Sequence, residues 1–219
     1  MASKLPTIAD LKNFAVNQPG VYEVTRQTLY DFTTYAALGQ SSLNFFQLPQ
    51  GQGGKTKADT NMEAAGALPS PKHFIISSIE VQFFPGVSPG TLQTDLAASQ
   101  FTNDVYAVAK SGYLDLFVGS TSFLTEAPIG RFPPKTKLEV EAAYSIFRTL
   151  ATAANGEDAL VMDYAAMCGR PYYIDPELTL IPTQNFNVTL NWPTPVPLPS
   201  GVAGRIGIVL DGLLYRLAQ

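Results

Sequence analysis

Alternating apolar and polar residues along several segments predict a protein built mainly from β-strands. The cleanest alternation covers residues 185–192, where Asn and Thr fill the positions between the apolar residues. A second covers residues 113–119. The positions expected to face a core are Phe186, Val188, Leu190 and Trp192 in the first segment and Leu114, Leu116 and Val118 in the second. This pattern is typical of strands with one face on a core and the other in solvent.

Three further segments are expected to be strands. The longest is 73–84, which ends at Pro85-Gly86. The odd-numbered positions of this segment include the apolar residues Ile75, Ile79, Val81 and Phe83. The even-numbered positions include the polar residues Ser78, Glu80 and Gln82. Residues 21–29 carry Val, Tyr and Thr, which favour strands, and residues 42–48 form a short segment that ends at Pro49.

The apolar residues of 206–217 change parity at Asp211-Gly212. Ile206, Ile208 and Leu210 share one parity, and Leu213, Tyr215 and Leu217 share the other. Two structures give this pattern: an Asp-Gly hairpin turn between two strands, or one long strand with a bulge at Gly212. The hairpin is the favoured prediction.

Helical patterns interrupt the strands. Residues 92–110 have apolar residues at helical spacing before a stop at Gly112. Residues 138–154 begin as a strand and then continue as a helix through Ile146, Phe147 and Leu150, whereas 158–168 fit either structure. With about eight strands and these insertions, the chain is expected to be an all-β sandwich, with no linker that divides it.

Residues 1–19 are expected to form a short helical arm ahead of the main domain, which spans 20–219. Thr7 and Asp10 resemble a capping box, and Pro19-Gly20 stops the pattern. The apolar face of the helix holds Ile8, Leu11 and Phe14, which are candidate subunit contacts. This face either packs on its own domain or reaches a neighbouring subunit or a lipid surface.

Composition changes this picture in one respect, the scarcity of charge. Charged residues make up 15% of the 219 residues, against roughly 25% in typical soluble domains. We therefore expect part of the surface to be covered by other subunits, in an oligomer.

The net charge of −4 provides no basic field, so no direct nucleic-acid binding is expected. No apolar run is long enough to cross a membrane, and no secretory signal is recognised, which predicts synthesis in the cytoplasm.

The residues that could support catalysis are few, and the chain is not expected to be an enzyme. His73 is the only histidine and Cys168 the only cysteine, so neither a His-dependent nucleophile nor a zinc site is indicated. No cofactor is expected.

Two ligand-binding motifs are incomplete. Residues 51–56, Gly-Gln-Gly-Gly-Lys-Thr, match the end of a phosphate-binding loop, but Pro49 stands where its first glycine belongs. Asp59, Asn61 and Glu63 have the spacing of a calcium loop, but Ala64 replaces the required glycine. The first motif is therefore interpreted as an exposed Gly-rich loop, and no metal site is expected.

Alternating prolines follow the strand predicted at 185–192. The sequence Trp-Pro-Thr-Pro-Val-Pro-Leu-Pro at 192–199 stiffens the chain into an extended path. It is either a rigid connection or a pre-ordered contact loop, in which Pro195 and Pro197 are candidate subunit contacts.

Two segments resemble the ends of jelly-roll major capsid proteins of tailless icosahedral bacteriophages. These are Leu180 to Trp192 (LIPTQNFNVTLNW) and Gly207 to Arg216 (GIVLDGLLYR), and Asn61 to Pro69 (NMEAAGALP) is similar to a segment of phage structural proteins. The resemblance implies a single viral jelly roll whose last two strands pair. It also implies a structural virion protein, made in the host cytoplasm, that assembles as trimers or larger capsomers into an icosahedral shell.

Other virion proteins are the further partners that the resemblance implies, and whether an internal membrane is one of them stays open. Two alternatives to a shell protein also remain. One is a phage spike or fibre component, and the other is a receptor-binding, carbohydrate-binding or hydrolytic β-sandwich.

Overall fold

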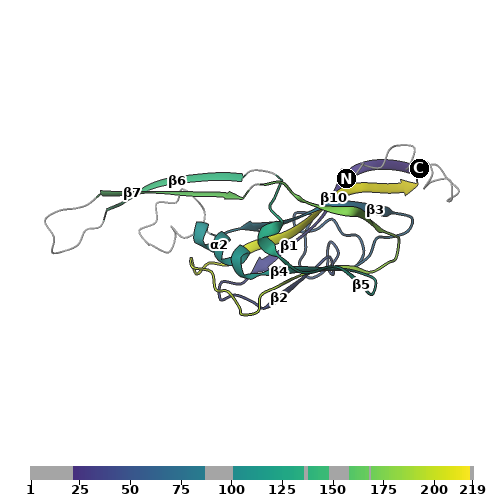
Figure 1. The fold of residues 1–219 in the computed structure, drawn as a ribbon, viewed down its shortest axis with the longest axis horizontal. Helices are drawn as coiled ribbons and strands as arrows, with labels where there is room; N and C mark the ends of the chain where they lie inside the picture. The colour runs from purple at the N-terminus through teal and green to yellow at the C-terminus, as the bar shows by residue number, and fades with distance from the viewer. Residues whose placement is uncertain (1–21, 87–100, 136–137, 148–157, 168, 218–219) are drawn as a thin grey trace.

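The protein is an all-β sandwich of two antiparallel four-stranded sheets, as the sequence predicts (Figure 1). The computed structural model describes residues 22–86, 101–135, 138–147, 158–167 and 169–217. The first sheet contains, in order, β1 (Tyr22–Tyr35), β10 (Gly204–Leu217), β3 (His73–Phe84) and β8 (Tyr172–Leu180). The second contains β2 (Ser42–Phe45), β9 (Phe186–Asn191), β4 (Tyr113–Val118) and β5 (Thr121–Pro128).

In the part of the chain that the structure describes, three smaller elements lie outside these sheets. Helix α2 (Phe101–Ser111) and the 3-10 turn η2 (Ile129–Arg131) pack together, and the amide of Ile129 donates to the carbonyl of Gly112 at 3.0 Å. Strands β6 (Leu138–Phe147) and β7 (Asp158–Met167) form a hairpin that projects away from the sandwich (Figure 1).

The core lies between the two sheets and is lined by the parities that the sequence predicts for β4 and β9. The inward side chains of these strands are all buried: Leu114, Leu116, Val118, Phe186, Val188 and Leu190. Trp192, just after β9, is 1% exposed, and its ring meets that of Tyr35 edge-on at 5.1 Å. Burying a large apolar side chain contributes about 1.5–3 kcal/mol, so this layer supplies much of the stability.

Strand β3 departs from its predicted parity because it contains a bulge. Its register with β8 and β10 shifts between Ile76 and Ser78, which leaves Ser77 as the extra residue. The inward residues are therefore Phe74 and Ile76 before the bulge and Ile79, Val81 and Phe83 after it. The prediction that Ile75 shares the inward parity is wrong, because one inserted residue moves all earlier side chains to the opposite face.

The hairpin favoured at Asp211-Gly212 is wrong. Strand β10 runs unbroken from Gly204 to Leu217 and pairs with β1 along its whole length. The two neighbouring strands impose this path, and the extra residue lies in β3, opposite Asp211 and Gly212. Strands β9 and β10 lie in different sheets, so the implied pairing of the last two strands is also wrong.

Replacing Gly212 with alanine should lower the free energy of unfolding by about 1–3 kcal/mol, the usual cost of overpacking. A Cβ at this position would overlap the carbonyl oxygen of Ile75 beside the bulge, and backbone cannot move aside as a side chain can. Gly130→Ala is the matched control, because its Cβ would meet nothing within 4 Å. Urea unfolding of both variants tests this, and equal losses would contradict it.

Element boundaries and one further assignment also need correction. Strand β1 continues six residues beyond the expected end at Leu29, and β2 ends before Phe46, whose φ is +67°. Helix α2 falls within the expected 92–110 apart from its last residue, but it is described only from Phe101. Ile146 and Phe147 belong to a strand and not to a helix, because β6 pairs with β7 over its whole length.

Some predictions fall on residues that the structure does not describe. These are the helical arm at 1–19 with its candidate contacts Ile8, Leu11 and Phe14, the helix at Leu150, and Cys168. They stay predictions.

Candidate functional site

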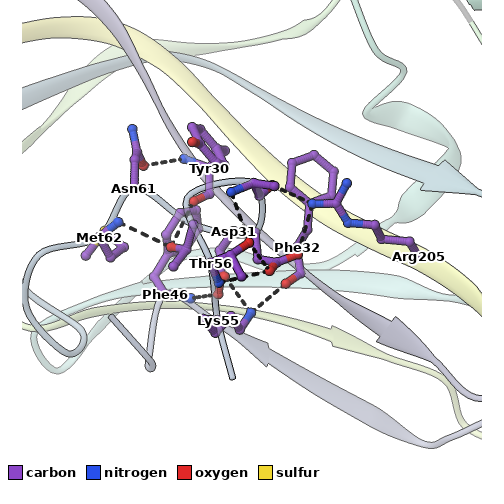
Figure 2. A network of polar contacts seen from close by, with 12 residues as sticks. Tyr30, Asp31, Phe32, Phe46, Lys55, Thr56, Asn61, Met62 and Arg205 are labelled. Atoms are coloured by element: carbon purple, nitrogen blue, oxygen red, sulfur yellow. Dashed lines mark hydrogen bonds and ion pairs between the residues drawn. The ribbon is translucent and has the colours of Figure 1, made fainter. Parts of the chain in front are cut away.

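The Gly-rich loop after β2 is held to β1 by a buried ion pair (Figure 2). Asp31 of β1 is 1% exposed. Its Oδ1 accepts a hydrogen bond from Lys55 Nζ at 2.6 Å, and its Oδ2 accepts one from the amide of Phe46, also at 2.6 Å. Lys55 Nζ also donates to the carbonyl oxygen of Phe32 at 2.6 Å. Both carboxylate oxygens and the ammonium group are thus committed within the protein.

This arrangement supports the rejection of a phosphate-binding loop. Lys55 would be the phosphate-binding lysine of such a motif, but its charge is used by Asp31. Gly51, Gly53 and Gly54 have φ of +85°, +58° and +78°, so they form tight turns ahead of Lys55. No helix follows the loop before β3, and a phosphate cradle needs a helix N-terminus.

The candidate calcium ligands do not converge. Asp59 accepts hydrogen bonds from Thr56 and forms an ion pair with Arg205 at 3.1 Å. Asn61 exchanges hydrogen bonds with the backbone of β1, and Glu63 pairs with Lys72. Among the described residues, no group of three or more His, Cys, Asp or Glu could hold a metal ion.

Burial and hydrogen bonding shift the pKa of several carboxylates. Desolvation raises the pKa of Asp31, although Lys55 and the Phe46 amide act in the opposite direction. The hydrogen bonds from Thr56 lower the pKa of Asp59, and Arg205 acts in the same direction. These shifts follow from structural contacts that fix the loop, so they do not identify a catalytic group.

His73, the only histidine, is the first residue of β3 and is 7% exposed. Burial lowers its pKa, which favours the neutral imidazole.

Within the described residues, no helix is long and apolar enough to cross a membrane.

The proline loop, residues 192–199 after β9, is hydrogen-bonded to the sandwich at alternate residues. The carbonyl of Val196 accepts a hydrogen bond from the hydroxyl of Tyr35 at 2.8 Å, and the amide of Leu198 donates to the carbonyl of Ala37 at 2.8 Å. Pro197, between these anchors, and Pro195, just before the first of them, are exposed. The loop therefore presents both candidate contact residues to solvent on a fixed backbone.

A second buried carboxylate secures the end of this loop. Asp104 of α2 is fully buried, and it accepts hydrogen bonds from the amide and the hydroxyl of Ser200 at 2.9 and 2.6 Å. Burial raises its pKa above the ordinary 3.8, against the effect of these hydrogen bonds.

The raised pKa of Asp104 predicts a dependence of stability on pH. The folded state takes up this proton at higher pH than the unfolded state, so stability should rise as the pH falls through the window just above 3.8. Asp104→Asn lacks the titrating group. The free energy of unfolding of the unmodified protein, relative to this variant, should therefore increase between pH 7 and pH 4. A decrease in that window would show that the bonds to Ser200 outweigh burial.

The outer face of the sheet β2-β9-β4-β5 carries a row of hydrogen-bonded polar side chains. Asn191 accepts from Ser42 at 2.9 Å and donates to Asp115 at 2.8 Å. Asn44 accepts from Thr189 at 3.0 Å. Two exposed aromatic side chains lie on β4 and β5: Phe117 and Phe123. Phe117 lies on the same outward face of β4 as Asp115, whereas Phe123 is the extra residue where the register of β5 shifts. Polar groups beside an exposed ring are suited to contact with polar ligands such as sugars.

Sequence reasoning missed the buried carboxylates of Asp31 and Asp104. It placed the Asn and Thr residues of 185–192 on a polar face, but not their hydrogen-bond partners on the neighbouring strands. Asp31 lies on the same face of β1 as the core residues Leu29 and Tyr35, and a lone acid at such a position signals a buried partner.

Comparisons with protein-family models, with curated proteins and with solved structures each found no match.

Proposed function

We propose that this chain is a structural virion protein: a single jelly roll that assembles into the icosahedral shell of a bacteriophage. The order of strand pairing carries the proposal. With the hairpin β6–β7 set aside as an insertion, the eight remaining strands pair first with last, second with seventh, third with sixth and fourth with fifth. A chain folded double and then rolled into two sheets has this order, which is that of a jelly roll.

The jelly roll serves capsid proteins, lectins and cupin enzymes, so the choice among them depends on other features. A cupin site needs several histidines, and the sequence has one. The low charge favours a surface that is covered by other subunits. The two segments that resemble phage capsid proteins fall largely on β9 and β10, one in each sheet. These features favour the shell protein over the other two classes.

In this proposal the partners are further copies of the chain, as trimers or larger capsomers, and other virion proteins. The exposed Pro195 and Pro197 are contact candidates, because their fixed backbone loses little entropy on binding. The N-terminal helix expected at residues 1–19 serves assembly more than folding.

Purified protein at micromolar concentration should sediment as trimers or larger species, and electron micrographs should show closed particles or capsomers. In the source particle the chain should be present in hundreds of copies. A monomer across the micromolar range, or a few copies per particle, would refute a shell protein.

The protein is expected to enclose a genome without binding it. Each phosphate neutralised by a protein adds about 0.9 to the salt slope of binding, so a genome-coating surface needs clustered cations. The net charge here is −4. Filter binding to DNA and RNA at about 150 mM salt, beside a basic control protein, should detect no salt-sensitive binding tighter than micromolar. Such binding would instead indicate a nucleoprotein coat.

A second candidate function is carbohydrate binding, as in a spike or other receptor-binding module. The polar row on the sheet β2-β9-β4-β5, with exposed Phe117 and Phe123, is the observation that favours it. A glycan array would detect binding, and Phe117→Ala with Phe123→Ala should then abolish it. No binding to any glycan would remove this candidate.

A further inference from the structure

The hairpin of β6 and β7, here called the arm, has little support from the rest of the fold: β7 contacts helix α2, and neither strand belongs to the two sheets of the sandwich. Its strands pair with each other from Leu138↔Met167 to Phe147↔Asp158, and they join no other strand in the described part of the chain. The arm extends beyond the sandwich (Figure 1). Ten residues per strand make it ~33 Å long. An isolated hairpin is marginally stable in water, so an arm of this length calls for a binding partner.

The composition of the arm indicates the chemistry of that partner. Of its 20 strand residues, 15 are apolar, four are acidic and none is basic. The acidic residues are Glu139, Glu141, Asp158 and Asp163. The rest of the chain contains 14 acidic and 14 basic residues, so the arm accounts for the whole net charge of −4. Two arms would repel each other, whereas a cationic surface with exposed rings would complement one arm.

Such a surface lies around the base of the arm. Arg131 and Arg170 stand before β6 and after β7, and the amide of Gly169 donates to the carbonyl of Pro134 at 3.1 Å, which holds the two ends together. Arg170 lies over the ring of Tyr173 at 5.4 Å. The root patch is defined here as Tyr106, Lys110, Arg131, Arg170 and Tyr173.

The cations and rings of the root patch are available to bind another molecule. Lys110 lies over the ring of Tyr106 at 5.4 Å, on the helix that packs against η2. In the described residues, no carboxylate lies within 4.0 Å of the charged groups of Lys110, Arg131 or Arg170. Tyr106 and Tyr173 are 63% and 52% exposed. Unpaired cations beside exposed rings suit an acidic, apolar ribbon.

We propose that the arm of one copy binds the root patch of a second copy of this chain. The proposal rests on the proposed function, because it names the element that joins subunits of the shell. Each copy carries one arm and one root patch, so it can donate one contact and accept another. One face of the ribbon offers roughly 300–500 Å² from its length and strand spacing. Where two copies exchange arms, the two contacts form one interface, whose area approaches the ~800 Å² per partner of a stable complex.

Charge reversal on either side tests this pairing in the full chain. The arm variant is Glu139→Lys with Glu141→Lys, the root variant is Arg131→Glu with Arg170→Glu, and the swapped variant carries all four changes. Sedimentation velocity from about 1 to 100 μM should show at least tenfold weaker self-association for the arm and root variants. The swapped variant should regain most of the loss. Lys57→Glu, an exposed change in the Gly-rich loop, is the control and should associate normally.

Each outcome separates this inference from the proposed function. Far-ultraviolet circular dichroism and Trp192 emission first establish that every variant is folded. If the arm and root variants associate as tightly as the unmodified chain, or the swapped variant regains nothing, the arm does not bind the root patch. Closed particles formed by those variants would overturn this inference and leave the shell function standing. Arm-dependent dimers that never close into particles would overturn the shell function alone.

Discussion

Trp192→Ala is expected to lower the free energy of unfolding by about 3–5 kcal/mol, the usual effect of deleting a buried aromatic side chain. The indole is 1% exposed between the two sheets. Its Nε1 donates a hydrogen bond to the carbonyl of Val108 at 3.1 Å, and its ring packs on Tyr35. The substitution therefore leaves a cavity and also an unsatisfied carbonyl in α2, and the two losses add.

Urea unfolding followed by circular dichroism measures this loss, with Phe123→Ala as the control because Phe123 is 48% exposed. Trp192→Phe should lose less than Trp192→Ala, since it keeps most of the packing. Trp192 is the only tryptophan, so the emission of the unmodified protein reports its surroundings directly. An emission maximum typical of an indole in water would contradict the buried position.

Lys55→Met is expected to lower the free energy of unfolding by about 3–5 kcal/mol, as when one partner of a buried ion pair is removed. Asp31 would keep its charge in a site where its side chain is 2% exposed, with the Phe46 amide as its main remaining donor. The carbonyl of Phe32 would also lose the donor Lys55 Nζ. Loss of the pair should release the Gly-rich loop from β1 before the sandwich unfolds.

Lys57→Met is the matched control, because Lys57 is an exposed lysine of the same loop. The double variant Asp31→Asn with Lys55→Met should lose less than the sum of the two single variants, because it leaves no unpaired charge. Hydrogen exchange of the loop amides would detect the local release. Equal losses for Lys55→Met and Lys57→Met would show that the ion pair does not hold the loop.

Strands in which apolar and polar residues alternate without an inserted residue could be predicted from the sequence. The alternation over 185–192 and 113–119 places every inward residue correctly, because neither β9 nor β4 contains a bulge. Strand β3 could not be predicted in the same way. The bulge at Ser77 exists only in relation to β8 and β10, and residues near Ser77 do not encode that register.

The paths of β6 and β10 likewise depend on partners far along the chain. Asp211-Gly212 is a good hairpin turn in isolation, but β1 and β3 flank it on both sides and extend the strand through it. Ile146 and Phe147 fit a helix until β7 is placed beside them. Local propensity is weaker than a ladder of hydrogen bonds to a neighbouring strand.

The contacts of the candidate site could not be predicted from the sequence. Pro49 and Ala64 are single residues that break known motifs, and the structure gives Lys55 and Asp59 other partners. The Asp31–Lys55 and Asp104–Ser200 contacts join residues 24 and 96 positions apart, and only the fold brings them together.

The pairing of β1 with β10 has a consequence for how the protein is made. The register joins Tyr22 to Leu217, and β10 lies between β1 and β3 in the middle of its sheet. Ribosomes add about 5–20 residues per second, so β1 and β3 wait on the order of ten seconds or more for the strand that separates them. During that time their apolar faces and edges are open to other nascent chains. Slow translation near the 3′ end, or loss of chaperones, should therefore reduce the soluble yield more than the stability of the finished fold would suggest.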